Sequence, residues 1–218
     1  MVHWETSLRA VSDSFLITVP GFEARRDATV AHLDECGFNQ SILFHQFVGI
    51  NGETAGLSCT NTHTLPDGTI YTPTPKHVSL CLNHWFLWQR ILSRAMTSKD
   101  DFSIVLEDDV RFTSNWFEKL KRAIQDVPED WDILFLGSCY ARNFPVAHIV
   151  GDIWKVEKPN CTHAYCVRHK ALPVLIEKCH RIYTNIDWAI IEQAIPHLKT
   201  YAILPRLADQ FTMEDLPE

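Results

Sequence analysis

The stretch S-I-V-L-E-D-D-V-R-F, residues 103–112, decides the fold and points to a site. Its first part is apolar enough for a buried strand, and three consecutive acids, Glu107, Asp108 and Asp109, follow at once. In open α/β sheets, ligands bind beyond the carboxyl ends of the strands. Carboxylates buried together are costly unless a cation or hydrogen-bond donors offset them, and oxygen-rich acidic sites favour Mg²⁺ or Mn²⁺. The stretch therefore predicts either a metal site at a strand end or an acidic turn in solvent.

Strand-like and helix-like segments alternate on both sides of this stretch. We expect strands over residues 14–19, 41–50, 103–109, 131–138 and 200–205, and a β-hairpin over 151–160 and 163–169. We expect helices over residues 23–37, 77–98, 114–127, 170–183 and 187–198, the third with Ser114 as its N-cap. This alternation predicts an α/β fold with a mainly parallel sheet in a single domain, residues 1–218. The sequence has neither G-x-G-x-x-G nor G-x-x-x-x-G-K-[ST], so a dinucleotide fingerprint or a P-loop is not supported.

Composition excludes several classes of function. The 218 residues carry a formal net charge of -7, which argues against a nucleic-acid partner. No apolar run reaches the roughly 20 residues that span a bilayer, and the N-terminus lacks a basic segment followed by a long apolar one. We therefore expect a cytoplasmic protein, bacterial or viral, with at most peripheral membrane contact. The seven cysteines include no C-x-x-C pair and are expected to be reduced, mostly buried thiols.

Residues 51–76 are rich in Gly, Thr and Pro and are expected to form a long loop. Loops of this length are uncommon in compact domains unless they are functional or mobile. We therefore hypothesise that the segment closes over a bound ligand as a lid.

The motif F-S-I-V-L-E-D-D-V-R-F, followed by D-W-D-I-L-F-L-G-S, resembles glycosyltransferase family 25, the lipooligosaccharide and collagen galactosyltransferase group. Other segments match that family's motifs in the same order. L-C-L-N-H-W-F-L-W resembles its G-C-x-L-S-H-x-x-L-W helix, with Asn83 where Ser is common, and T-H-A-Y-C-V-R-H-K-A resembles its G-T-x-A-Y-x-I-S-x-x-G-A segment. The resemblance covers most of residues 14–207.

The resemblance implies a GT-A fold and a transfer that inverts the anomeric carbon. The expected reaction moves a hexose, with galactose favoured, from a UDP-sugar to a glycan hydroxyl, with Mn²⁺ (or Mg²⁺) as cofactor. By this analogy Asp109 is the metal ligand, Asp108 contacts the ribose or sugar of the donor, and Glu107 lies on the nucleoside side. Two alternatives stay open: a nucleotide-sugar hydrolase, and a non-catalytic sugar-binding relative, which the departure at Asn83 favours.

Further donor-binding residues are expected on either side of the acidic triplet. Arg26, in preference to its neighbour Arg25, suits a phosphate or a base edge, and the alternative is a solvated helix charge. His84 is either a donor contact or a packed helix histidine. Thr162 and His163 are expected near the donor sugar, and a structural hydrogen bond to the backbone is the alternative for both.

An inverting transfer needs a carboxylate that takes the proton of the acceptor hydroxyl. We favour Asp187 as this general base, with Glu192 as its substitute. The alternative for Asp187 is an acid in the first turn of a helix, where negative charge is favourable. Trp188 could stack on an acceptor sugar, although core packing is the default for a tryptophan.

Overall fold

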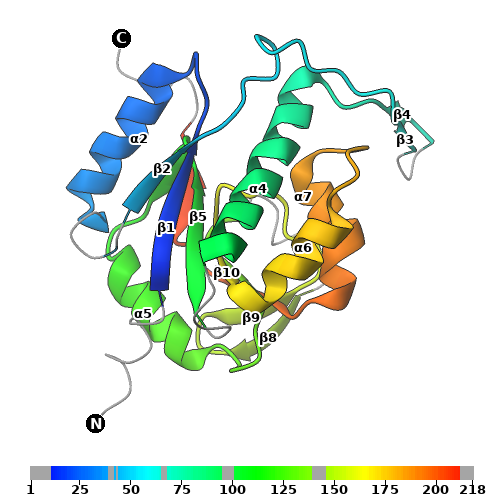
Figure 1. Cartoon of the computed structure of the whole chain (residues 1–218). Coiled ribbons are helices and arrows are strands. Elements are labelled where there is room, and N and C mark those ends of the chain that lie inside the picture. The colour runs from blue at the N-terminus through cyan, green and yellow to red at the C-terminus, as the bar shows by residue number, and fades with distance from the viewer. Residues whose placement is uncertain are drawn as a thin grey trace.

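The computed structural model describes residues 11–38, 42, 44–64, 68–94, 101–138 and 146–211. Its centre is an eight-stranded sheet (Figure 1). The strands, in sheet order, are β2 (Phe44–Val48), β1 (Val11–Thr18), β5 (Phe102–Glu107), β10 (Ala164–Arg168), β7 (Ile133–Phe135), β11 (Thr200–Ile203), β9 (Ile153–Val156) and β8 (Val146–Val150). β10 and β9 run opposite to the other six strands. The expected α/β class with a mostly parallel central sheet is confirmed.

Helices cover both faces of this sheet (Figure 1). α2 (Glu23–Glu35) and α5 (Trp116–Asp126) pack on one face, and α4 (Pro75–Arg94), α6 (Leu172–Lys178) and α7 (Ile186–Ala189) pack on the other. A 3₁₀ turn, η2 (His169–Ala171), precedes α6, and a π-helical turn, η3 (Ile190–Ala194), and a second 3₁₀ turn, η4 (Ile195–His197), continue α7.

Alternation along the strands divides the core between the two faces. In β1, Phe15 and Ile17 contact the cluster under α4, whereas Leu16 contacts the cluster under α2. In β5, Val105 faces α4, and Ile104 and Leu106 face the other way. Strands that are buried on both faces read as continuous apolar runs, which explains why S-I-V-L lacks a polar alternation.

Two short ribbons lie outside the main sheet. β6 (Val110–Phe112) pairs with β12 (Ala208–Gln210), which brings the end of the described chain beside the acidic triplet. β3 (His63–Thr64) pairs with β4 (Ile70–Tyr71) inside the segment that we expected to be an irregular loop. That segment ends where α4 begins, at Pro75.

Three expectations about local structure are wrong. Residues 151–169 do not form one hairpin, because β9 pairs with β8 and β11 while β10 lies between β5 and β7. Ser114 does not cap α5: the N-cap is Asn115, in a left-handed conformation with φ 58° and no side-chain capping bond. Cys161 is disulfide-bonded, whereas the other five described cysteines are free.

No helix within the described ranges is long and apolar enough to cross a membrane.

Candidate functional site

A cavity of about 280 Å³ opens at the carboxyl ends of β1 and β5. Glu107, the last residue of β5, lines it together with Asp108 and Asp109, which form the turn into β6. Asp187, in the first turn of α7, lines the same cavity. The structure therefore brings the acidic triplet and the expected general base to one site, although 78 residues separate Asp109 from Asp187 in the sequence.

The reversed direction of β10 brings a second segment to this site. Ala164, at the start of β10, pairs with Leu106, near the end of β5. The Glu107 N–H donates to the His163 carbonyl at 3.0 Å. Thr162 and His163, which precede β10, are therefore held beside the carboxyl end of β5, where a parallel strand would have placed its opposite end.

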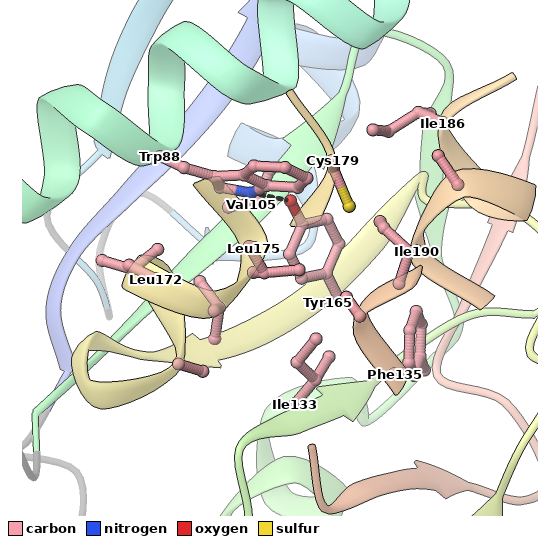
Figure 2. Packing of buried hydrophobic residues seen from close by; sticks show 14 of the residues in the cluster. Trp88, Val105, Ile133, Phe135, Tyr165, Leu172, Leu175, Cys179, Ile186 and Ile190 are labelled. Atoms are coloured by element: carbon pink, nitrogen blue, oxygen red, sulfur yellow. Dashed lines mark hydrogen bonds between the residues drawn. The ribbon is translucent and has the colours of Figure 1, made fainter. Parts of the chain in front are cut away.

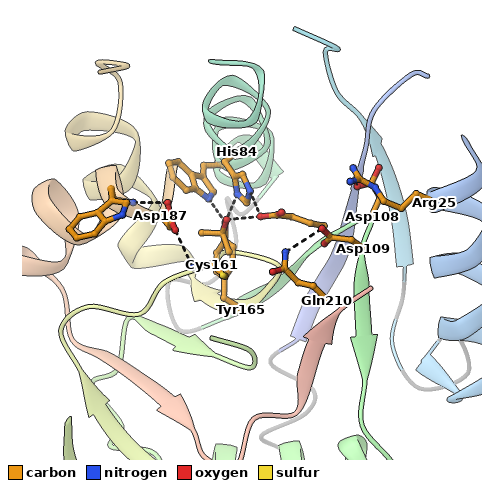
Figure 3. Close-up of polar contacts among 12 residues, drawn as sticks. Arg25, His84, Asp108, Asp109, Cys161, Tyr165, Asp187 and Gln210 are labelled. Atoms are coloured by element: carbon orange, nitrogen blue, oxygen red, sulfur yellow. Dashed lines mark hydrogen bonds and ion pairs between the residues drawn. The ribbon is translucent and has the colours of Figure 1, made fainter. Parts of the chain in front are cut away.

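Glu107 is held as an anion by two donors. The Thr162 hydroxyl donates to Glu107 Oε1 at 2.5 Å, and His84 Nε2 lies 3.2 Å from the same oxygen (Figure 3). Burial raises the pKa of Glu107, but the hydrogen bond and charge interaction with His84, together with Thr162, outweigh it, so the pKa lies below its usual value.

Buried hydrogen bonds fix the orientation of His84 through its Nδ1, the ring nitrogen that does not contact Glu107. The Trp88 indole N–H donates to the Tyr165 hydroxyl at 2.8 Å, as Figure 2 shows, and that hydroxyl lies 3.0 Å from His84 Nδ1. Because the Trp88 indole can only donate, the Tyr165 hydroxyl accepts there. The His84 Nε2–H donates to Glu107. His84 therefore orients Glu107 from within the core and is not itself a lining residue of the cavity.

Asp108 forms an ion pair with Arg25 from the first turns of α2. Arg25 Nη2 lies 2.5 Å from Asp108 Oδ1, and the Asp108 side chain is 5% exposed. The Thr29 hydroxyl donates to the Asp108 carbonyl at 2.7 Å and fixes the turn to α2. Burial raises the pKa of Asp108, and the Arg25 charge opposes that rise. Oδ2 of Asp108 is buried without a hydrogen-bond partner.

Asp109 is an acid of the site with a strongly raised pKa. Gln210 Nε2 donates to its Oδ2 at 3.2 Å, while its Oδ1 is buried without a hydrogen-bond partner. Burial, followed by the charge of Glu107, raises the pKa of Asp109 to about 7. Gln210 is there because β12 pairs with β6. A buried carboxylate oxygen with no donor, next to other acids, is a position that a cation would fill.

Asp187 accepts a main-chain hydrogen bond at each carboxylate oxygen. The Cys161 N–H donates to Oδ2 at 3.2 Å and the Trp188 N–H to Oδ1 at 2.9 Å (Figure 3). Burial raises the pKa of Asp187, and the bond from Cys161 opposes the rise. Asp187 thus lies in the first turn of a helix, as its structural alternative expected, and its carboxylate also lines the cavity. Trp188 packs against the core, in agreement with the default expectation.

Other expected site residues do not line the cavity in the described part of the chain. Arg26 pairs with its neighbour Asp27 at 2.7 Å, and Arg25 takes the place in the site that we had assigned to Arg26. His163 is fully buried: its Nε2 lies 3.3 Å from the Ala208 carbonyl, and burial lowers its pKa. Gly137 leaves room for this ring, since a Cβ there would lie 2.0 Å from His163 Nε2.

Glu192, the substitute base, also lies away from the lining residues. Its Oε2 accepts from the Tyr183 hydroxyl at 3.0 Å, and its Oε1 lies 3.2 Å from His63 Nε2 in β3. Glu192 therefore connects the 51–74 segment to the π-helical turn.

The sequence reasoning missed polar residues from the start of α4 and from the loop before it. Lys76 and His77 line the cavity, as does Asn83. Asn83, where the family motif has Ser, accepts from the Ile50 N–H at 2.7 Å and donates to the Ile50 carbonyl at 3.1 Å. The departure at Asn83 thus clamps the backbone after β2. The available signal was the position of these residues in the first half of the helix, at the boundary with the long loop.

Two carboxylate oxygens at the cavity could serve as ligands of a divalent ion. No group of three or more His, Cys, Asp or Glu side chains gathers to hold a metal within the described residues. Asp109 Oδ1 and Asp108 Oδ2 are each buried without a partner at the cavity. Mg²⁺ is commonly held by one or two carboxylates, with substrate phosphates and waters as the other ligands. The described residues alone therefore offer fewer ligands than such an ion needs.

Comparisons with known proteins give partial sequence matches to members of glycosyltransferase family 25. No protein-family model matches the chain. The human inactive glycosyltransferase 25 family member 3 is 35% identical over 69 residues, 30% of this chain and 11% of that protein. The mouse procollagen galactosyltransferase 2 is 26% identical over 133 residues, 56% of this chain and 20% of that protein. The matched regions thus span about a tenth to a fifth of the curated relatives' length.

Two solved glycosyltransferase structures align with most of the chain at low sequence identity. One is a glycosyltransferase involved in the glycosylation of the major capsid of PBCV-1, with a TM-score of 0.48, 12% identity and coverage of 88% of this chain and 82% of that chain. Another is a Drosophila β-1,4-galactosyltransferase 7 mutant in complex with manganese, UDP-Gal and xylobiose, with a TM-score of 0.40, 12% identity and coverage of 88% and 65%.

The sequence similarity defines a glycosyltransferase-like protein. Within that class, the similarity is to glycosyltransferase family 25, and the resemblance that the motifs indicated is confirmed.

Proposed function

We propose that the protein is an inverting GT-A glycosyltransferase that moves a hexose, with galactose favoured, from a UDP-sugar to a glycan hydroxyl with the help of Mn²⁺ or Mg²⁺. The observation that carries the proposal is the meeting of Asp109, with its unpartnered buried Oδ1, and Asp187 at one cavity. The activity that the name of procollagen galactosyltransferase 2 states supports the choice of galactose.

In this proposal, each side of the cavity has its own task. Asp109 would hold the metal. Asp108 would bind a hydroxyl of the donor through its Oδ2. The ion, when bound, offsets the charge that develops on the leaving diphosphate. Arg25 neutralises Asp108 Oδ1 and keeps that carboxylate in place. Asp187 takes the proton of the acceptor hydroxyl while that oxygen attacks the anomeric carbon from the face opposite the diphosphate.

A nucleotide-sugar screen by thermal shift, with and without Mn²⁺, tests the donor half of the proposal. A ligand that binds the native state raises the melting temperature by mass action. Because the protein's own shell is incomplete, we expect Mn²⁺ alone to shift the melting temperature little and Mn²⁺ with a UDP-hexose to shift it strongly. A strong shift with Mn²⁺ alone, or none with any nucleotide sugar, would contradict the proposal.

Transfer assays with an acceptor test the other half. We expect Asp187→Asn to lower kcat by roughly 100-fold or more while the UDP-dependent thermal shift is kept, since a general base contributes about 10²–10⁴-fold. Glu192→Gln is the matched control, and we expect only a small change in kcat. Release of free sugar at the same rate without an acceptor would indicate a hydrolase.

A second candidate is a non-catalytic sugar-binding relative. The names of the inactive family members among the similar proteins favour it. Asp109→Ala separates the two: the enzyme would lose metal-dependent donor binding, whereas a sugar-binding relative would keep its glycan binding.

A further inference from the structure

Two consecutive residues, Cys161 and Thr162, bond to carboxylates that come from different elements. The Cys161 N–H donates to Asp187 Oδ2 at 3.2 Å, and the Thr162 hydroxyl donates to Glu107 Oε1 at 2.5 Å. All four residues line the cavity. Glu107 ends β5 and Asp187 lies in the first turn of α7, so residues 161 and 162 connect the acidic triplet to the expected base.

The backbone of Cys161 is in an uncommon conformation. Its φ is 73°, and Asn115 is the only other non-glycine residue of the described chain with a positive φ. Bulky and non-glycine residues rarely occupy this left-handed region. Cys161 is also the one described cysteine that is disulfide-bonded. A covalent cross-link at a residue in a disfavoured conformation can hold that conformation where an unconstrained side chain would let it relax.

We propose that Cys161 is a positioning residue for Asp187, with its left-handed backbone, held by the disulfide, directing its N–H to Asp187 Oδ2. This inference rests on the proposed function, in which Asp187 is the general base. The other oxygen, Oδ1, accepts from Trp188 in the same helix. Cys161 therefore provides the bond that ties the carboxylate to the segment before β10. Without it, α7 alone orients Asp187, and a small misplacement of a catalytic group is costly.

The inference is tested by substitutions that distinguish the effect of the backbone conformation from the effect of the sulfur atom. Cys161→Val disfavours the left-handed conformation and removes the disulfide, whereas Cys161→Gly permits that conformation and also removes the disulfide. We expect Cys161→Val to lower kcat for transfer about tenfold or more, with little change in KM for the donor or in the UDP- and Mn²⁺-dependent thermal shift. We expect Cys161→Gly to recover most of the lost kcat. Cys161→Ala replaces Cys161→Val if the latter does not fold.

A reductant tests the role of the disulfide. Tris(2-carboxyethyl)phosphine should lower kcat of the wild type and leave that of Cys161→Gly at its untreated value, because the glycine variant has no bond at this position to lose. Equal kcat for the Val and Gly variants would overturn the inference. An equal effect of the reductant on the wild type and on Cys161→Gly, or a parallel loss of donor binding, would also overturn it.

Amide hydrogen exchange at residue 161 provides a readout that does not depend on activity. We expect exchange to be slow in the wild type and in Cys161→Gly, and faster in Cys161→Val and in Asp187→Ala. If the wild type neither binds UDP nor transfers sugar, the proposed function fails, and this pattern still decides whether residue 161 holds Asp187. Unchanged exchange in Asp187→Ala would show that the contact is not formed.

Discussion

Asp109 is held in a place where its own charge destabilises the fold. Its pKa is raised to about 7, from an ordinary value of 3.8, by burial and by the neighbouring charge of Glu107. The native state therefore binds a proton there more tightly than the unfolded chain does. Stability from this residue is lost as the pH rises from about 4 through 7. A site that is suited to bind a cation destabilises the fold when the cation is absent, because nothing then offsets the charge of the Asp109 carboxylate.

Asp109→Asn should therefore stabilise the metal-free protein at pH 8. Each pKa unit corresponds to about 1.4 kcal/mol, so the gain in free energy of unfolding is at most roughly 4 kcal/mol. Calorimetric melting temperatures at pH 8 and pH 4.5 measure it, and the gain should be much smaller at the lower pH, where the native carboxyl is protonated. The same variant should lose Mn²⁺-dependent UDP binding. A variant that is less stable than the wild type at pH 8 would contradict the raised pKa.

Arg25 and Arg26 are adjacent in sequence and differ in their surroundings. Removal of Arg25 leaves the Asp108 carboxylate, 5% exposed, without its ion-pair partner. Arg25→Ala should thus lower the free energy of unfolding by about 2 kcal/mol or more, and the melting temperature by about 5 °C.

The matched control is Arg26→Ala. Its partner Asp27 is 66% exposed, so the change should be within about 0.5 kcal/mol. Equal melting temperatures for the two variants would show that the Arg25–Asp108 pair contributes little.

At the scale of elements, the sequence predicts the helices and strands whose limits follow from hydrophobic periodicity and from turn residues. The apolar run before Glu107 and the amphipathic patterns of α2 and α4 predict those elements to within a few residues. The position of β10 in the sheet is set by tertiary packing, since its apolar sequence fits either strand direction. For the same reason the sequence could place Thr162 near the site but could not show that its hydroxyl would bond to Glu107.

Side-chain roles on one helix also depend on packing. Successive helix residues point about 100° apart, and the docking of α2 on the sheet decides that Arg25 and not Arg26 faces Asp108. The disulfide at Cys161 had no signal in the cysteine spacing. By contrast, the sequence could place the acidic triplet at a strand end and Asp187 near a helix start, and such ends gather at one edge of an α/β sheet.

The segment between β2 and α4 has both of its ends at the cavity. Asn51 to Glu53 line it at one end and Lys76 and His77 at the other. In between, Asn61 donates to the Ile182 carbonyl at 2.7 Å and His63 contacts Glu192. Within the described residues, the segment is thus held near its ends and by contacts of Asn61 and His63 between them.

We expect UDP and Mn²⁺ together to protect residues 51–74 from limited proteolysis. A ligand that contacts both ends of the segment would favour its closed arrangement. Cleavage rates measured by mass spectrometry, with UDP alone and Mn²⁺ alone as controls, would show it. Protection that is the same with and without the two ligands would count against a lid.

At the scale of the whole molecule, one sheet joins two apolar clusters. Leu87 of α4 is fully buried on one face, and Leu120 of α5 is fully buried on the other. β1, β5, β7 and β10 contribute residues to both clusters. If the helices on one face separated from the sheet, they would expose strands that also form the core of the other face, because side chains alternate along each strand. This coupling argues that the chain unfolds as a single domain.

We therefore expect Leu87→Ala and Leu120→Ala to lower one common unfolding midpoint. Each removes buried methylene groups and leaves a cavity, so the free energy of unfolding should fall by about 2–5 kcal/mol in both variants. Urea titrations followed by tryptophan fluorescence and by far-ultraviolet circular dichroism should give coincident transitions in the wild type and in each variant. If the helices on the two faces belonged to separate folding units, Leu87→Ala would shift one transition and leave a second at the wild-type midpoint, and Leu120→Ala would do the reverse.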